Sequence, residues 1–403
     1  MVLENPVSDI VSARLFIRAG SALETQANAG LVSFLMGLLT KGTARLSSMA
    51  IAEAVESVGA SLSTDAAADY SVISLKTVSA DFEAIFALAA TLLREPSFPE
   101  AEIELERRLT LQQIRSMQEQ PFTVAFNQLR QDMYGDHPYA LSSIGTEASI
   151  LSLTREQLLA FHQQHFRPDN LVITVVGRIT PEAAAAQIEH SLGGWLQPES
   201  AGPGLSFPGV SSPATVSLIS QETNQAIIMV GYPAAAVEHP AYAALKLLNT
   251  YLGSGLSSRL FVELREKRGL AYDVSAFYPT RLGLSQFVAY MGTAPDNAAT
   301  ALDGLRFEVE RLKDTVLTED ELQAAKNKLL GQYALGKQTN AQIAQLLGWY
   351  EILGLGVEFD QQFPDRVNAV TAGEAEAVAQ EFFHDPCISL LGPEAAIAPL
   401  GKR

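Results

Sequence analysis

The alternation of apolar and polar positions predicts one series of elements in each half of the chain. In the first half, residues 70–76 alternate as a half-buried strand does, and a helix is expected to begin near Asp81. The prolines within residues 96–99 mark the end of that helix. A second helix is then expected over residues 101–118.

The second half repeats this order. Residues 285–291 are strand-like, a helix is expected to begin near Asp296, and residues 322–338 predict a long helix after a break at residues 318–319. The spacing from Asp81 to Asp296 is nearly equal to the spacing from Pro99 to Thr318. Two landmarks at nearly one offset predict an α+β fold built from two copies of a unit of roughly 200 residues.

A proline- and glycine-rich segment separates the two copies. Residues 197–213 hold four prolines and three glycines without a periodic apolar face, which predicts a linker between domains 1–196 and 214–403. Residues 171–176 predict the last strand of the first unit, and residues 226–230 predict the opening strand of the second. Both runs are densely apolar, as in strands covered on two faces, and the pattern leaves antiparallel and mixed pairing open.

Composition narrows the class of protein. A chain of 403 residues with 47% hydrophobic and 18% charged residues can bury substantial cores. The net charge of −17 argues against nucleic acid as a partner and would suit basic peptides. No apolar run approaches the roughly 20 residues that span a bilayer, so no membrane span is expected.

Localisation is expected to be cytoplasmic. The single Cys387 excludes an intrachain disulfide framework and fits a reducing compartment, and residues 1–10 lack the pattern of a signal peptide. A periplasmic or exported location stays open, because a trimmed targeting segment would leave no trace.

The segment of residues 30–43 resembles the zinc-site helix of the insulinase/pitrilysin peptidases, in the mitochondrial-processing-peptidase-like branch. Active members read close to G-x-x-H-F-L-E-H-M-x-F-K-G-T there. The residues that match in register are Gly30, Phe34, Leu35, Lys41, Gly42 and Thr43. By this resemblance, the fold should be two sheets, each with helices on one side, which close like a clam around a chamber.

The zinc-binding positions of this motif are lost. By the resemblance, Ser33 and Gly37 stand where the ligand histidines should be, Met36 stands for the general-base glutamate, and Gln113 for the third ligand. A catalytic zinc needs three protein ligands, an open water position and a base. We therefore expect no cofactor in this chain and no peptidase activity from the chain alone.

A second family element is retained. Residues 257–274 resemble the segment that carries an arginine and a tyrosine seven residues apart, here Arg265 and Tyr272. In the family this pair faces the zinc, holds the substrate backbone and helps to stabilise the oxyanion. A permanently charged guanidinium and a phenol donor suit that task.

Both residues also have plainer interpretations. Arg265 could be one of several solvated charges in residues 263–268. Tyr272 could belong to the core, because it begins the alternating series Tyr272, Val274, Ala276 and Tyr278. The register preserved around Gly269 favours the functional interpretation.

Two classes of function follow. In the first, the chain is the non-catalytic subunit of a heterodimeric zinc peptidase, and a zinc-bearing homologous subunit completes the active site for peptide substrates. In the second, it is a scaffold or peptide-binding protein without a part in catalysis. The retained Arg265 and Tyr272 favour the first class.

Other candidate sites are weaker. His162 and His165 have a spacing that could bind a metal, but no carboxylate or cysteine nearby completes a ligand set. The glycines of residues 253–255 follow a helical run and not a strand, so they predict the end of a helix rather than a nucleotide loop. His137 is expected to shape a turn, and Cys387 lacks the context of a nucleophile.

Overall fold

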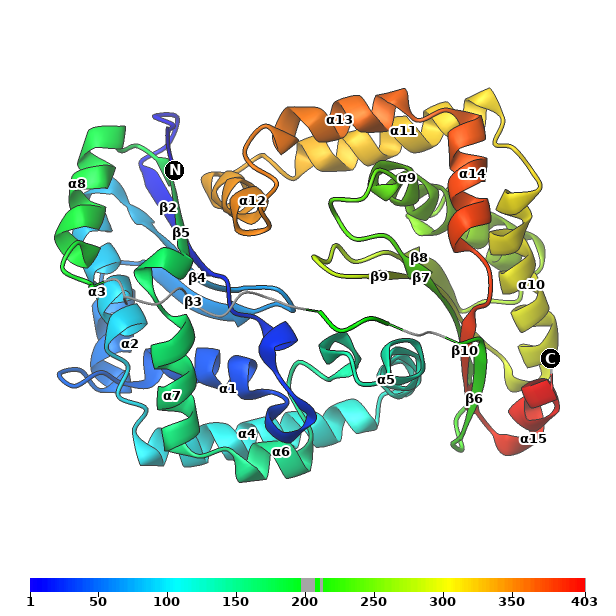
Figure 1. The fold of residues 1–403 in the computed structure, drawn as a ribbon, viewed down its shortest axis with the longest axis horizontal. Coiled ribbons are helices and arrows are strands. Elements are labelled where there is room, and N and C mark those ends of the chain that lie inside the picture. Colours follow the sequence, from blue (N-terminus) through cyan, green and yellow to red (C-terminus); the bar gives the residue numbers. More distant parts are fainter. Residues whose placement is uncertain (197–206, 211–212, 403) are drawn as a thin grey trace. The chain divides into compact units, whose positions relative to one another are not determined.

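The computed structural model describes residues 1–196, 207–210 and 213–402, so most of the predicted linker lies outside the described residues (Figure 1). The chain forms two compact units that are not continuous halves. The first combines Met1–Ile114, a segment that begins at Leu141, and Ala334–Asp360. The second combines Arg115–Ala140, Phe207–Tyr333 and the chain from Gln361 onward.

The first unit contains a five-stranded sheet in the order β1-β5-β2-β4-β3. β1 pairs with β5 in parallel, and the other neighbours are antiparallel. The strands are β1 (Val2–Glu4), β2 (Ile10–Ile17), β3 (Ser61–Ala66), β4 (Ser71–Val78) and β5 (Leu171–Gly177).

The second unit contains a sheet of the same design, in the order β6-β10-β7-β9-β8, with β6 and β10 parallel. Its strands are β6 (Thr215–Ser220), β7 (Ala226–Ala234), β8 (Asp273–Phe277), β9 (Ser285–Thr293) and β10 (Cys387–Gly392). In the sequence, β7 follows β2 at the same spacing at which β10 follows β5. The predicted duplication is therefore confirmed, and the strand pairing that the sequence left open is mixed.

One face of the first sheet forms the core of its unit. The odd-numbered residues of β2, from Val11 to Ile17, pack against buried residues of α1, α3 and α8. The helices of this unit are α1 (Leu31–Leu38), α2 (Ser48–Glu56), α3 (Phe82–Arg94), most of α4 (Glu100–Gln118), α6 (Glu147–Ser152), α7 (Arg155–His165), α8 (Pro181–Leu192) and α12 (Asn340–Ile352).

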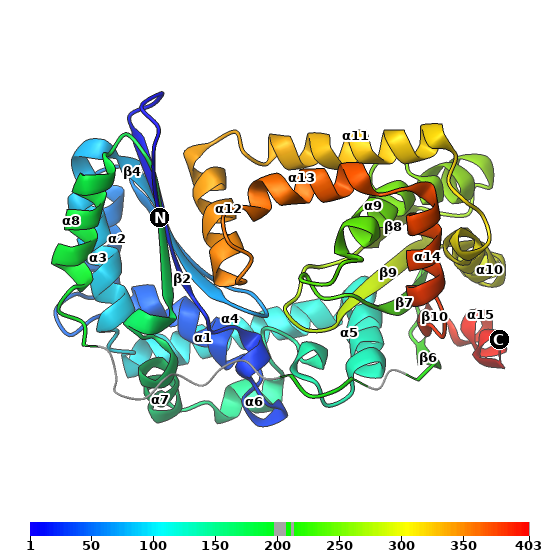
Figure 2. The ribbon, with the colours of Figure 1, turned by 45° about the horizontal axis from the view of Figure 1, so that its top comes forward.

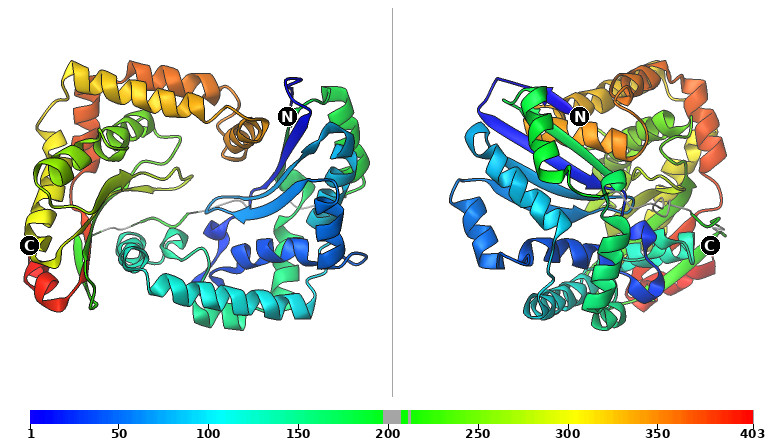
Figure 3. Two further views of the ribbon diagram at one scale, coloured as in Figure 1. Left: turned by 180° about the vertical axis from the view of Figure 1, so that it is seen from behind. Right: turned by 60° about the vertical axis from the view of Figure 1, so that its left-hand side comes forward.

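The second sheet is covered in the same way. α10 and α14 lie beside this sheet (Figure 3). Tyr232 of β7 contacts Phe383, directly after α14, at a ring distance of 5.4 Å. The helices of this unit are α5 (Pro121–Tyr134), α9 (Tyr242–Gly253), η7 (Phe261–Lys267), α10 (Ala298–Glu310), α11 (Glu319–Leu335), α13 (Phe359–Ala369), α14 (Ala372–Phe382) and α15 (Glu394–Ile397). α11 ends where the segment Ala334–Asp360 of the first unit begins, and α13 begins where that segment ends.

Each sheet takes the helix on its second face from the other half of the chain (Figure 2). α12 packs on β2 and β5, where the Thr174 hydroxyl donates to the Ala344 carbonyl at 2.7 Å. α5 packs on β7 and β10, and Gly231 of β7 leaves room for Met133 of α5. The expectation of helices on only one side of each sheet is therefore wrong.

Most predicted elements are present at their expected places. β4, α3 and α4 confirm the strand and the two helices of the first half, and β9, α10 and α11 confirm those of the second. The second unit does not open with residues 226–230, however, because β6 precedes them as an edge strand. Among the described helices, none is long and apolar enough to cross a membrane.

Candidate functional site

The helix α1 is positioned by a buried carboxylate. The amide groups of Gly30 and Val32 donate to Oε2 and Oε1 of Glu24, each at 2.8 Å, so Glu24 binds donors at the helix N-terminus. Gly30 has a φ of 87°, a left-handed conformation that suits glycine. Burial raises the pKa of Glu24 to about 8, although the two amide hydrogen bonds act to lower it.

Of the three positions of α1 that correspond to the lost motif, two share one face of the helix and the third points into the core. Ser33 and Gly37, one turn apart, are partly exposed on one face of the helix. Met36 is 1% exposed and packs in the core of the first unit. Its carbonyl accepts a hydrogen bond from the Thr64 hydroxyl of β3 at 2.7 Å.

The carboxylate of Glu106, in α4, lies beside Gly37. A Cβ atom at position 37 would stand 2.7 Å from Oε1 of Glu106, so this carboxylate occupies the space where a larger side chain would start. Burial raises the pKa of Glu106, the nearby Lys41 lowers it, and Glu102 raises it further. Gln113, two helical turns after Glu106, is exposed.

Glu106 was missed in the sequence, although a signal was present. Residues seven apart lie on the same face of a helix, so the face of α4 that carries Gln113 also carries Glu106. The acidic residues along that face were the signal that could have identified it.

The residues around α1 do not fit a zinc ion. They offer a hydroxyl from Ser33, a carboxylate from Glu106 and an amide from Gln113, whereas zinc sites use several imidazole, thiolate or carboxylate ligands. Within the part of the chain that the structure describes, no group of three or more His, Cys, Asp or Glu residues could hold a metal ion.

Arg265 lies in a seven-residue π-helix, η7. π-Helical turns are rare and frequent at functional sites. Its basic neighbours are engaged, because Lys267 binds Glu263 at 2.8 Å and Arg268 binds Glu308 at 3.0 Å. Arg265 is exposed, lies 4.9 Å from the ring of Phe261, and has no carboxylate partner among the described residues. Arg265 therefore differs from the other charges in its segment.

Tyr272 is the exposed member of an otherwise buried series. It is 58% exposed, whereas Val274, Ala276 and Tyr278 are at most 7% exposed, so the core interpretation is wrong for Tyr272. Its amide donates to the Gly292 carbonyl at 2.8 Å, which fixes the backbone at the start of β8. Arg265 and Tyr272 both lie in the second unit, while Ser33, Met36, Gly37 and Gln113 lie in the first.

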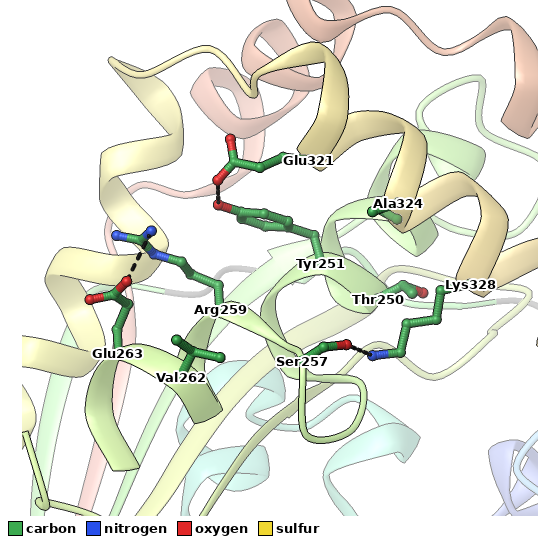
Figure 4. A pocket seen from close by; sticks show the side chains of 10 residues that line it. Thr250, Tyr251, Ser257, Arg259, Val262, Glu263, Glu321, Ala324 and Lys328 are labelled. Carbon is green, nitrogen blue, oxygen red and sulfur yellow. Dashed lines mark hydrogen bonds and ion pairs between the residues drawn. The ribbon is translucent and has the colours of Figure 1, made fainter. Parts of the chain in front are cut away.

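A cavity of about 210 Å³ lies between α9, η7 and α11, next to the turn that carries Arg265 (Figure 4). Its polar groups bind one another: Tyr251 donates to Glu321 at 2.9 Å, Arg259 pairs with Glu263 at 3.2 Å, and Lys328 donates to Ser257 at 3.1 Å. Ligand pockets usually measure about 300–1,000 Å³. This cavity is smaller, and its polar side chains already have hydrogen-bond or ion-pair partners. We therefore interpret these contacts as a structural link between the three elements.

A larger pocket, of about 560 Å³, opens at the start of β8. Asp273, the residue after Tyr272, lines it together with Glu222, Phe122 and Tyr290. The rings of Phe122 and Tyr290 meet edge to face at 4.9 Å. Burial and the neighbouring Asp273 raise the pKa of Tyr290. Two carboxylates beside aromatic rings favour a basic side chain as the occupant.

The remaining candidates have structural roles. His162 bonds the Leu93 carbonyl at 2.8 Å, and His165 is buried against Phe161. The prediction of a turn at His137 is confirmed, because its Nδ1 accepts from the Tyr139 amide at 3.0 Å. α9 ends at Gly253, which confirms the predicted helix end, and Cys387 is buried in β10.

Comparisons with known proteins identify relatives over nearly the whole chain. Residues 1–147 match the sequence model described as insulinase, peptidase family M16, and residues 152–329 match the one described as the peptidase M16 inactive domain. An uncharacterized zinc protease of Streptomyces coelicolor is 28% identical over 94% of this chain and 84% of its own length. The uncharacterized zinc protease YmxG of Bacillus subtilis is 25% identical over 98% of this chain and 96% of its own length.

Solved structures agree with this match. A peptidase M16 inactive domain from Pseudomonas fluorescens superposes with a TM-score of 0.90 at 26% identity, covering 97% of this chain and 95% of that one. A protease from Helicobacter pylori has the same TM-score of 0.90 at 20% identity, covering 97% of this chain and 96% of that one, which supports the fold alone.

Proposed function

We propose a function from one premise: the chain belongs to the insulinase family of peptidases, family M16. The proposal is that it acts as the zinc-free subunit of a heterodimeric zinc peptidase. A zinc-bearing homologous partner would supply the metal and the general base. This chain would supply Arg265 and Tyr272, which hold the substrate backbone and stabilise the developing oxyanion.

One observation carries the proposal: exposed Arg265 and Tyr272 stand on a scaffold whose own α1 offers no zinc ligands. Neither side chain has a hydrogen-bond partner among the described residues, so neither is needed to hold the fold. Binding and catalytic residues are often carried by exposed segments that a rigid scaffold positions, which fits this pair.

The pocket beside Tyr272 supports a peptide as the substrate. It lies one residue along the strand from Tyr272, and its volume of about 560 Å³ exceeds the needs of one long side chain. Glu222 and Asp273 would favour lysine or arginine at the peptide position that enters it.

The test combines this chain with a homologue from the same organism that carries an intact H-x-x-E-H motif. Each purified chain is first analysed for zinc and assayed alone on an internally quenched peptide. We expect no stoichiometric zinc and no cleavage from this chain, and an activity of the mixture well above the sum of its parts. Assembly is followed by size-exclusion chromatography.

Two results would contradict the proposal. One is a tightly bound zinc in this chain that is lost when α1 is mutated. The other is a mixture no more active than the homologue alone, although both chains are folded. If this chain then binds peptides without promoting cleavage, the scaffold or peptide-binding function replaces the subunit function.

A further inference from the structure

Three basic side chains gather around the connection between β8 and β9, away from the groups described so far. Arg281 belongs to that connection, Arg130 comes from α5 and Lys246 from α9. All three are partly buried. The charge of Arg281 acts on both of the others and lowers the pKa of each, so Arg281 lies near both.

An aromatic ring lies against each member of this cluster. The guanidinium of Arg281 lies 5.3 Å from the ring centre of Tyr139, and that of Arg130 lies 5.2 Å from Phe126. The Lys246 ammonium lies 4.9 Å from the Tyr278 ring and donates to the Tyr278 carbonyl at 2.8 Å. The electron-rich ring faces stabilise each cation in part.

No acidic side chain of the described residues pairs with this cluster. Among the described residues, no Asp or Glu lies within ion-pair distance of Arg130, Lys246 or Arg281, although the chain as a whole has a net charge of −17. The nearest acidic residue along α5, Asp132, accepts a hydrogen bond from Gln128 at 2.8 Å instead. Three like charges kept together in a strongly acidic protein require a reason.

One donor of the cluster is also left without a partner among the described residues. Nε of Arg130 is buried and makes no hydrogen bond, and one amino group of the same side chain reaches Asn127 at 2.7 Å. Burial is the first cause that lowers the pKa of Arg130, to about 10, and of Lys246, to about 8. A buried charged donor without an acceptor is unfavourable, and an anion would relieve both the missing hydrogen bond and the repulsion.

We propose that Arg130, Lys246 and Arg281 form a binding site for a small oxyanion, either a carboxylate group of a peptide or a phosphate. The guanidinium groups present paired donors that match the geometry of either group, and the ammonium adds a third point of contact. The tyrosines Tyr139, Tyr242 and Tyr278 frame the site and exclude part of the solvent. The site is separate from Arg265 and Tyr272, so it does not depend on the function proposed above.

The test measures the binding of inorganic phosphate to the full chain by calorimetry and by the shift in melting temperature, at low ionic strength. A second arm compares two short peptides of one sequence, one with a free C-terminal carboxylate and one with a C-terminal amide. We expect saturable binding of phosphate, of the free-acid peptide, or of both. In the Arg281→Gln variant the affinity should fall on the order of tenfold or more, since one such factor corresponds to about 1.4 kcal/mol.

Two further variants make the result specific. Arg306→Gln removes an equal charge that is already paired with Glu310 at 3.2 Å, and it should bind as the wild type does. Arg281→Lys keeps the charge but lacks the paired donors, so its affinity should lie between those of the wild type and of Arg281→Gln. Binding of phosphate alone would identify phosphate as the ligand class, and a preference for the free-acid peptide over the amide would identify a carboxylate.

The proposal is wrong if neither probe binds the folded wild type. It is also wrong if Arg306→Gln weakens binding as much as Arg281→Gln does, because the effect would then follow net charge alone. Near-ultraviolet circular dichroism of each variant separates a loss of binding from a loss of folding. If Arg281→Gln does not fold, the same comparison is made with Lys246→Met.

Discussion

At the scale of single residues, two carboxylates lie against α1. Glu24 accepts two backbone amides at the start of the helix, and Glu106 fills the space beside Gly37. Both side chains are shielded from solvent enough for burial to raise their pKa values. Glu24 therefore holds the start of the helix, and Glu106 limits the size of the side chain that fits at position 37.

Restoring the zinc ligands should fail for a structural reason. The fourfold variant Ser33→His, Met36→Glu, Gly37→His and Gln113→Glu places an imidazole against Glu106 and a carboxylate at a position that is 1% exposed. An unpaired carboxylate in a core is strongly destabilising. We expect a lower melting temperature than that of Ser33→His alone, weak zinc binding at best and little activity. Robust turnover, with zinc retained through dialysis, would show that the site had kept its catalytic architecture.

Glu24 makes stability depend on pH. Its pKa is about 8 in the folded chain and near 4.5 when unfolded. Between these values the folded state binds more protons than the unfolded state, so the free energy of unfolding should fall as pH rises from about 4.5 to about 8. Glu24→Gln has no titrating group at this position, so its stability should not fall over this range. Below about pH 4.5 it should be the less stable protein, because its amide can accept only one of the two bonds. Urea unfolding of both proteins across this range measures the difference, and parallel curves would contradict it.

Arg265 and Tyr272 should matter for catalysis and not for folding. In the reconstituted complex, Tyr272→Phe removes one oxyanion donor, and such losses typically cost about 10²–10³-fold in turnover. Arg265→Ala should affect both KM and kcat, because it removes the charge that anchors the peptide backbone. Neither exposed side chain supports the core, so assembly and melting temperature should stay unchanged. Wild-type rates from both assembled variants would leave the pair without a catalytic role.

At the scale of elements, strands and helices with a regular apolar pattern can be predicted from the sequence, and elements without such a pattern cannot. The alternation in residues 70–76 and the apolar spacing after Asp81 correspond directly to β4 and α3. β6 was missed because its polar and half-buried residues resemble the linker beside it. The π-helix η7 was missed because its turn differs from the α-helical period on which the prediction of helices rests. The apolar face of a helix also does not reveal which sheet the helix packs against. The packing of α5 and α12 on the sheet of the opposite half therefore could not be predicted.

The contact of α12 with β2 can be tested at one glycine. A Cβ atom at Gly348 would lie 2.2 Å from the Phe16 ring, so Gly348→Ala should destabilise the fold by about 1–3 kcal/mol through overpacking. Gly331, in α11, is exposed and has open space around it, and Gly331→Ala should instead stabilise by about 1 kcal/mol through helix propensity. Chemical denaturation of the two variants gives opposite signs if the packing is as described. Equal shifts would mean that α12 does not rest on Phe16.

At the scale of the whole molecule, the two units share one plan, and each contains one helix from the opposite half of the chain. The sheets have matching strand orders, and α5 and α12, which begin at Pro121 and Asn340, take corresponding places on them. Each helix covers the sheet of the opposite half. The family and the fold class could be predicted from the sequence. The packing of α5 and α12 on the sheet of the opposite half is seen only in the three-dimensional structure.

Separate halves should therefore be unstable. We expect residues 1–206 produced alone to expose the face of β2 that α12 covers, and to aggregate or bind a hydrophobic dye. Co-expression with residues 207–403 should recover a soluble complex. Its melting temperature should be only moderately lower than that of the intact chain. A half that folds alone with a sharp melting transition would contradict this expectation.

The exchange of α5 and α12 has the form of a domain swap that takes place inside one covalent chain. In a swapped dimer, two identical protomers each lend a segment to the other and neither is complete alone. Here the two segments are exchanged between the two copies of a duplicated unit. Both copies belong to one chain, so no second molecule has to bind. Recombination that moved one copy into another gene would also remove the helix that covers the sheet of the other copy. The pair of copies is therefore the smallest piece of this chain that evolution could transplant intact.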